Sequence, residues 1–234
     1  MVSLKSFLVL VLLCAHGFAA SAQLLEFDRM LVYEQSDYNG SVVRYQLLLN
    51  SRSGLFGFDR KLASLSLPGV GDGFTFATGS PDGTYRIYTA TAYDGKTVQH
   101  YRVGQRAYAP GFAALCRQHF ARRYRPTGKT ERCFGLETSE YEASLGRRDR
   151  EYLTVARVPF HLYPAYLFNE MPIEAKLPDA HSLNFVGRLG PNDLLIESRK
   201  VYYSEQVAGK PAVSTLRLVY VGPVRYTFDA SGYR

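Results

Sequence analysis

The tripeptide Gly128-Lys129-Thr130 is the stretch of this sequence closest to a catalytic motif, because the same three residues end many phosphate-binding loops. Such a loop reads GxxxxGK[ST], and its leading glycine would fall on Arg123 here. The loop must also follow a strand and open a helix, whereas we expect a helix before this tripeptide and a strand after it. We therefore interpret the stretch as a corner, in which Pro126 ends the helix and Gly128 allows the reversal.

The other residues that could do chemistry do not have catalytic or metal-binding spacing. Residues 69–73 (GVGDG) lack the spacing of a dinucleotide loop, and no GxSxG nucleophile motif occurs. Glu140 and Glu142 fall on one face of an expected strand, where exposed carboxylates are common. The histidines after the N-terminal region are scattered, at His100, His119, His161 and His181. The sequence therefore predicts a non-enzymatic protein with no cofactor and no metal site.

The first 22 residues have the pattern of a secretory signal peptide. Lys5 supplies the positive start, residues 7–13 (FLVLVLL) the apolar run, and Ala20 and Ala22 the small residues of a cleavage site. The apolar run is too short for a membrane anchor, which needs roughly 20 residues. Lipid attachment at Cys14 is an alternative, but Leu13 stands where a small residue is expected. We predict a signal peptide at 1–22 and a soluble, exported product that is periplasmic or secreted.

The composition of the rest fits one β-rich domain, residues 23–234. The chain is 46% hydrophobic and carries 18 Tyr and 14 Phe but no Trp, and aromatic residues favour half-buried strands. The formal net charge of +7 suits anionic lipid or another acidic partner. That excess is too small to indicate nucleic acid, so no nucleic-acid partner is predicted.

Turn signals recur every 8 to 12 residues, the spacing expected of antiparallel strands. Asn39-Gly40, Asp82-Gly83 and Asp94-Gly95 are among them. The predicted strands are residues 27–35, 41–50, 54–58, 74–78, 84–92, 97–103, 130–142, 152–158, 194–207 and 214–221. Residues 158–171 are aromatic and interrupted by prolines, and we expect a loop with one or two helical turns there.

One amphipathic helix is predicted over residues 110–124 (PGFAALCRQHFARRY). Pro110 suits a first turn, and the residue before Pro126 is disfavoured in the α region. The apolar face, which should lie on the sheet, carries Phe112, Leu115, Cys116, His119 and Phe120. The opposite face carries Arg117, Arg122 and Arg123.

Two cysteines, Cys116 and Cys133, remain after removal of the signal peptide. Because an exported protein meets an oxidising compartment, we predict a disulfide between them, with two free thiols as the alternative. The closed loop is short, so the bond would stabilise the fold by about 3 kcal/mol in the chain-entropy model.

Several short segments, in their order along the chain, resemble exported bacterial proteins with the fold of the periplasmic lipoprotein carrier LolA. They are MLVYE at 30–34, YQLLLN at 45–50, PTGKT at 126–130 with Cys133, Gly135 and Tyr141 after it, and PF at 159–160 followed by PA and NEM at 164–165 and 169–171. The likeness spans most of the mature chain. It implies a mainly β (α+β) fold in which a strongly curved antiparallel sheet, an incomplete barrel, packs on the helix.

The resemblance also implies a ligand site, because such folds bind acyl chains or other apolar molecules between sheet and helix. The helix would contribute Phe112, Leu115 and Phe120 to the concave face, and a mobile flap would contribute Phe160, Tyr163, Tyr166, Leu167, Phe168 and Met171. The alternative is that these residues are ordinary core. Arg117, Arg122 and Arg123 would steer anionic headgroups or contact an anionic membrane surface, with a solvated helix face as the alternative.

Two function classes follow. The first is a carrier or sensor of an apolar or lipid-like molecule, and the second is an envelope interaction protein with a fully packed core. A hydrolase assembled from distant loops stays open, because such sites need no local motif. Interior volume separates the first two, since a carrier needs a cavity of a few hundred cubic ångströms.

Overall fold

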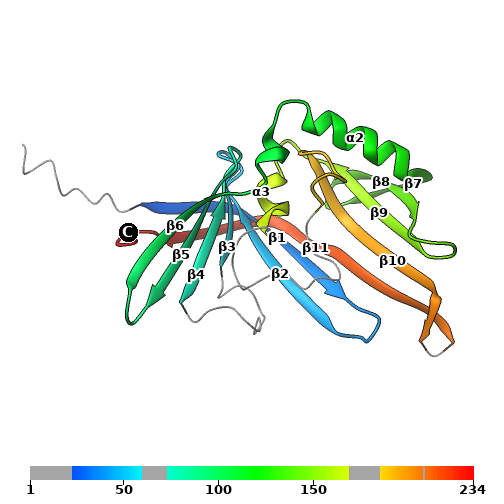
Figure 1. Cartoon of the computed structure of the whole chain (residues 1–234), viewed down its shortest axis with the longest axis horizontal. Coiled ribbons are helices and arrows are strands. Elements are labelled where there is room, and N and C mark those ends of the chain that lie inside the picture. Colours follow the sequence, from blue (N-terminus) through cyan, green and yellow to red (C-terminus); the bar gives the residue numbers. More distant parts are fainter. Residues whose placement is uncertain (1–22, 60–72, 169–184, 208) are drawn as a thin grey trace, which may run out of the picture.

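Eleven strands form one antiparallel sheet in the computed structural model, which describes residues 23–59, 73–168, 185–207 and 209–234. The spatial order is β6-β5-β4-β3-β2-β1-β11-β10-β9-β8-β7, so nearly every strand pairs with its neighbour in sequence. The exception is β1, which pairs with β2 on one side and with the last strand, β11, on the other. The sheet curves strongly and does not close (Figure 1), because β6 and β7 remain its two edges.

The strands in chain order are β1 (Leu24–Ser36), β2 (Val42–Leu49), β3 (Phe56–Asp59), β4 (Phe74–Gly79), β5 (Thr84–Thr91), β6 (Gly95–Arg102), β7 (Arg125–Cys133), β8 (Leu136–Ser144), β9 (Arg150–Arg157), β10 (Asp193–Val207) and β11 (Lys210–Asp229). The 3-10 helix η1 (Gln105–Tyr108) and the α-helix α2 (Phe112–Arg123) join β6 to β7, and the short helix α3 (Tyr163–Tyr166) follows β9. The predicted fold class, a mainly β fold in which a curved, unclosed antiparallel sheet packs on a helix, is confirmed.

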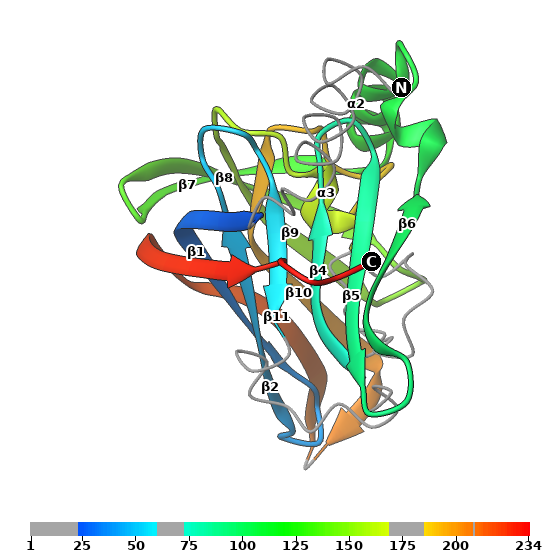
Figure 2. The same ribbon diagram turned by 90° about the vertical axis from the view of Figure 1, so that its left-hand side faces the viewer.

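The inner face of the sheet, which carries α2 and α3, holds the larger hydrophobic core. Figure 2 shows α3 between the two halves of the curved sheet, with β4 and β5 on one side and β9 and β10 on the other. Tyr85 on β5 donates its hydroxyl to the carbonyl of Pro164, and the Tyr166 hydroxyl bridges the backbone of β10. This inner core includes Leu31, Tyr33, Tyr45, Leu47, Leu153, Tyr163, Tyr166, Leu195 and Leu216.

A second, smaller core lies on the opposite face, where the paired ends of β1 and β11 fold back over β3–β5. The rings of Phe76 and Phe228 stack with centroids 4.2 Å apart, and the C-terminal Arg234 carbonyl accepts from the Val98 N–H of β6 at 2.8 Å. Bulges between Phe27 and Arg29 let β1 change the face that it buries. We call this the outer core; its buried members are Leu25, Phe27, Leu48, Phe76, Tyr88 and Ala230.

The segment predicted as one strand over residues 130–142 is a hairpin instead. β7 ends at Cys133 and β8 begins at Leu136, with Phe134 and Gly135 both at positive φ (52° and 78°) in the turn. A bulky residue with positive φ is uncommon, which explains why this turn was missed. Gly128 also has positive φ (83°), but it lies within β7 at a register shift between Pro126 and Thr130. The predicted reversal at Gly128 is therefore wrong.

Candidate ligand-binding site

A groove of about 580 Å³ lies on the inner face, between the C-terminal half of α2 and strands β8 and β9. Ser139 and Val155 are direct cross-strand partners, and Tyr141 follows Ser139 on the same face. Above them lies Phe120 of α2, whose ring meets the Tyr141 ring edge-on at 4.9 Å. The groove is lined by Phe120, Gly135, Leu136, Glu137, Ser139, Tyr141, Val155, Ala156, Arg157, Leu189 and Asp193.

Helix α2 holds Phe120 over the sheet through three residues spaced four apart, Phe112, Cys116 and Phe120. Cys116 is buried and its sulfur accepts from the Tyr163 hydroxyl at 3.6 Å. Phe112 meets the Tyr163 ring edge-on at 6.3 Å. The N-terminal half of the helix is therefore fixed on α3, whereas Phe120 is only half-buried and faces the groove.

One end of the groove is polar. The Arg157 Nη1 donates to Asp193 Oδ1 at 2.7 Å, and the Gly190 N–H donates to the other carboxylate oxygen at 2.7 Å. Both carboxylate oxygens of Asp193 thus accept hydrogen bonds from the protein itself. The rest of the lining mixes apolar side chains with Glu137 and Ser139 of β8, so the groove offers hydrophobic contact beside polar groups.

A buried carboxylate, Glu151, connects the end of α2 to the sheet. Glu151 is 0% exposed; its Oε2 accepts from the Tyr124 hydroxyl at 2.6 Å and its Oε1 from Arg188 Nη1 at 3.0 Å. Lys200 lies opposite Glu151 in the register of β9 and β10. Burial lowers the pKa of Lys200, and the Glu151 carboxylate opposes that change. Arg123 adds a looser contact, with Nη2 3.8 Å from Glu151.

The structure divides the predicted ligand-binding residues into two groups. Phe112, Leu115, Phe120 and Phe160 are half-buried, and among these Phe120 lines the groove. The remaining residues that lie within the described chain are fully buried in the inner core; they are Tyr163, Tyr166, Leu167 and Phe168. Met171 and the predicted signal peptide fall outside the described residues. The ligand-binding role of the whole set stays a prediction.

The predicted disulfide between Cys116 and Cys133 is not formed, and both residues are free thiols. The prediction assumed a reversal at Gly128 that would return the chain toward the helix. Instead β7 runs on for nine residues, from Arg125 to Cys133. At about 3.3 Å per residue this carries Cys133 roughly 26 Å along the strand from Arg125, where it lines a hollow with Lys129 and Phe134.

The three predicted anion-facing arginines are all exposed, but they do not lie together on one hollow. Arg122 and Arg123 line a hollow of about 290 Å³ at the C-terminal end of α2, together with His119, Phe120, Tyr124, Gly187 and Arg188. Arg117 does not line it. Whether any of the three contacts a membrane stays a prediction.

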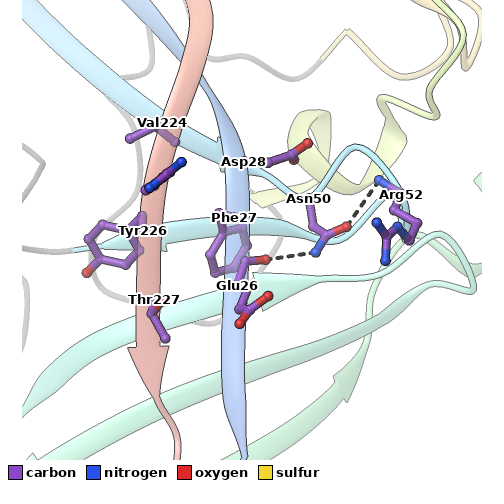
Figure 3. A pocket seen from close by; sticks show the side chains of 9 residues that line it. Glu26, Phe27, Asp28, Asn50, Arg52, Val224, Tyr226 and Thr227 are labelled. Carbon is purple, nitrogen blue, oxygen red and sulfur yellow. Dashed lines mark hydrogen bonds between the residues drawn. The ribbon is translucent and has the colours of Figure 1, made fainter.

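Two further hollows have several charged residues in their lining. The first, about 610 Å³, lies on the outer face beneath the β7–β8 hairpin, where charges pair with one another, as in Arg217–Glu197 at 2.7 Å. The second, about 380 Å³, lies between β1, β11 and the turn after β2 (Figure 3). There Asn50 donates to the Glu26 carbonyl and accepts from the Arg52 N–H, so its amide holds the turn (Figure 3).

The sheet side of the groove was not predicted. Leu136, Tyr141 and Val155 line it, and none was proposed as a ligand contact from the sequence. Gly135 was the available signal, because a turn there sets which alternate residues of β8 face inward. With that register, Ser139 and Tyr141 would have been placed on one face.

Within the described residues, no group of three or more His, Cys, Asp or Glu side chains is arranged to hold a metal ion. In the same part of the chain, none of the helices has the length and apolar character needed to span a bilayer.

No protein-family model and no curated protein matches the chain. Among solved structures, the chain is similar to a LolA superfamily protein from Nitrosomonas europaea, over 84% of each chain, at 12% sequence identity and a TM-score of 0.23. This is the superfamily that the sequence motifs resemble. A likeness with so low a TM-score carries no inference about function, which is argued below from the groove.

Proposed function

We propose that this protein is a non-enzymatic carrier or sensor that binds an apolar or lipid-like molecule in the groove between α2 and strands β8 and β9. The observation that carries this proposal is the wall formed by Phe120, Tyr141 and Val155. The groove volume of about 580 Å³ falls within the roughly 300–1,000 Å³ typical of small-molecule sites. The predicted signal peptide supports action outside the cytoplasm, in the periplasm or as a secreted protein.

The way in which α2 is held supports ligand entry at its C-terminal half. Phe112 and Cys116 fix the N-terminal half on Tyr163. Among the described residues, the Phe120 ring meets two other rings, those of Tyr124 and Tyr141, at 4.7 and 4.9 Å. A rotation of the Phe120 side chain, which is half-buried and packs against the inner core, would widen the groove.

Binding is tested with two variants at neighbouring positions of β9. Val155→Trp places a large ring in the groove, whereas Thr154→Trp places the same ring on the outer face. Titration of a neutral fluorescent acyl probe should show at least tenfold weaker binding by the first variant and an affinity within twofold of wild type for the second. Thermal unfolding checks that both variants fold.

Equal binding by wild type and a folded Val155→Trp variant would overturn the groove as the site. Absence of probe binding by the wild-type protein would favour the second candidate, an envelope interaction protein with a packed core. The observation in favour of that candidate is the burial of Tyr163, Tyr166 and Leu167, which fill the centre of the inner face.

A further inference from the structure

The hollow at the C-terminal end of α2 has a different chemistry from the groove beside it. Its volume is about 290 Å³, and its lining combines four basic side chains with two aromatic rings: His119, Arg122, Arg123, Arg188, Phe120 and Tyr124. The only carboxylate bonded to this group, among the described residues, is Glu151, which is fully buried beneath it. The surface that a ligand would meet is therefore basic and aromatic.

The charge of the buried carboxylate is neutralised by Arg188, which forms a shorter ion pair with it than Arg123 does. Arg188 Nη1 donates to Glu151 at 3.0 Å, while Arg123 Nη2 lies 3.8 Å away, beyond normal hydrogen-bond distance. Arg122 forms no ion pair with any described residue. Arg122 and Arg123 thus supply two exposed guanidinium groups, of which Arg123 keeps only the long contact with Glu151.

The C-terminal end of a helix opposes anion binding, because it carries about half a unit of negative charge. Two guanidinium groups outweigh that partial charge. Arginine also matches the geometry of a carboxylate or phosphate, since its planar group presents paired N–H donors. The hollow is therefore suited to an anion of small size.

The hollow and the groove share one residue, Phe120. An apolar chain lying along the groove past Phe120 would bring its end within reach of Arg122 and Arg123. Basic groups that lie at the end of an apolar groove select a molecule that has both parts, an acyl chain and an anionic head.

We propose that Arg122 and Arg123 bind the anionic head group, a carboxylate or phosphate monoester, of an amphiphile whose acyl chain lies in the groove. This inference rests on the proposed function, because it assumes that the groove takes the chain. Arg117, on the same helix but outside the hollow, has no part in it.

The test compares three single-chain ligands, dodecanoate, dodecyl phosphate and the uncharged dodecanol, by competition against a neutral fluorescent acyl probe. The variants are Arg122→Gln/Arg123→Gln and, as a control with the same loss of charge, Arg117→Gln/Arg125→Gln. The first double variant should bind both anions at least tenfold more weakly and dodecanol within twofold of wild type. The control should bind all three as wild type does. The ratio between the two anions identifies the preferred head group.

The outcomes separate the two proposals. If wild type binds none of the three ligands, the groove itself is rejected, and the head-group site with it. If dodecanol binds as tightly as both anions, only the head-group inference is overturned. The head-group inference is also overturned if the control variant loses as much anion affinity as the Arg122→Gln/Arg123→Gln variant. A second assay measures binding to phosphatidylglycerol vesicles. Loss of vesicle binding by both variants, with binding of the three dodecyl ligands unchanged, would overturn it too and would indicate a general membrane-facing charge.

Discussion

At the scale of single residues, Tyr124 joins the helix to the sheet. Its backbone N–H caps α2 by donating to the Phe120 carbonyl at 2.8 Å, and its hydroxyl donates to the buried Glu151 at 2.6 Å. Both bonds lie beside the proposed site. Tyr124 shares the Glu151 carboxylate with Arg123 and Arg188, and its ring stacks on Phe120 of the groove.

Stability should fall at alkaline pH because of this tyrosine. Burial, and then the hydrogen bond to Glu151, raise the pKa of Tyr124 to about 12. Since the neutral hydroxyl is favoured in the folded state, its contribution is complete below pH 10 and is lost as the pH rises toward 12. That contribution is about 2 kcal/mol, and it should disappear in Tyr124→Phe.

Urea unfolding of wild type and Tyr124→Phe between pH 8 and 12 measures this difference. The difference in free energy of unfolding between wild type and Tyr124→Phe should become smaller as the pH rises. Tyr93→Phe is the control, because Tyr93 is 98% exposed and should show no such trend. Parallel curves for wild type and Tyr124→Phe would contradict the role assigned to this hydroxyl.

The sequence indicated a role for Phe120 but not for Glu151. Phe120 follows from apolar spacing along a helix, which is a local signal. Glu151 looks like an exposed charge at the start of a strand, and its partners Tyr124 and Arg188 are far away in sequence. Pairing over such separations is set by tertiary structure, so no local pattern indicates it.

At the scale of elements, most boundaries were predicted because turns carry local chemistry. Asn39-Gly40 and Asp94-Gly95 were placed correctly, and Gly40 and Gly95 have the positive φ that such turns require. The β7–β8 hairpin was missed because Phe134 occupies a position where glycine or asparagine is usual. Placing the reversal at Gly128 instead of at this hairpin also favoured the incorrect disulfide.

The two thiols should therefore react independently. In a Cys14→Ser protein, a thiol reagent should modify half-buried Cys133 quickly and Cys116, which is 1% exposed, at least about tenfold more slowly, because that residue must wait for local opening. Denatured, unreduced protein should give two thiols per chain. Cys133→Ser should leave only the slow phase. If denatured, unreduced protein gave no reactive thiol, the predicted disulfide would be supported after all.

At the scale of the whole molecule, one sheet builds two cores because the paired ends of β1 and β11 fold back across its outer face. The sequence predicted the antiparallel sheet and its helix. It did not predict the second core, because bulges in β1 and β4 change which residues face which side. Phe74 and Phe76, two apart on β4, consequently lie in different cores.

The absence of a side chain at Gly57 should be essential to the packing of the outer core. A Cβ there would lie 2.7 Å from ring atoms of both Phe27 and Phe76, so Gly57→Ala should destabilise the protein by about 1–3 kcal/mol through overpacking. Gly146→Ala is the matched control, because its nearest neighbour, Asp149, is 3.8 Å away. Chemical unfolding measures both. Equal stability of the two variants would show that the outer core is loosely packed.

The same fold-back brings the two ends of the described chain together, since the Ala230 N–H donates to the Gln23 carbonyl at 3.0 Å. That junction lies at the opposite end of the molecule from α2 (Figure 1). A tether attached ahead of Gln23 would therefore join the protein at the end away from α2. The groove beside α2 would stay accessible whether the protein diffuses freely or is tethered.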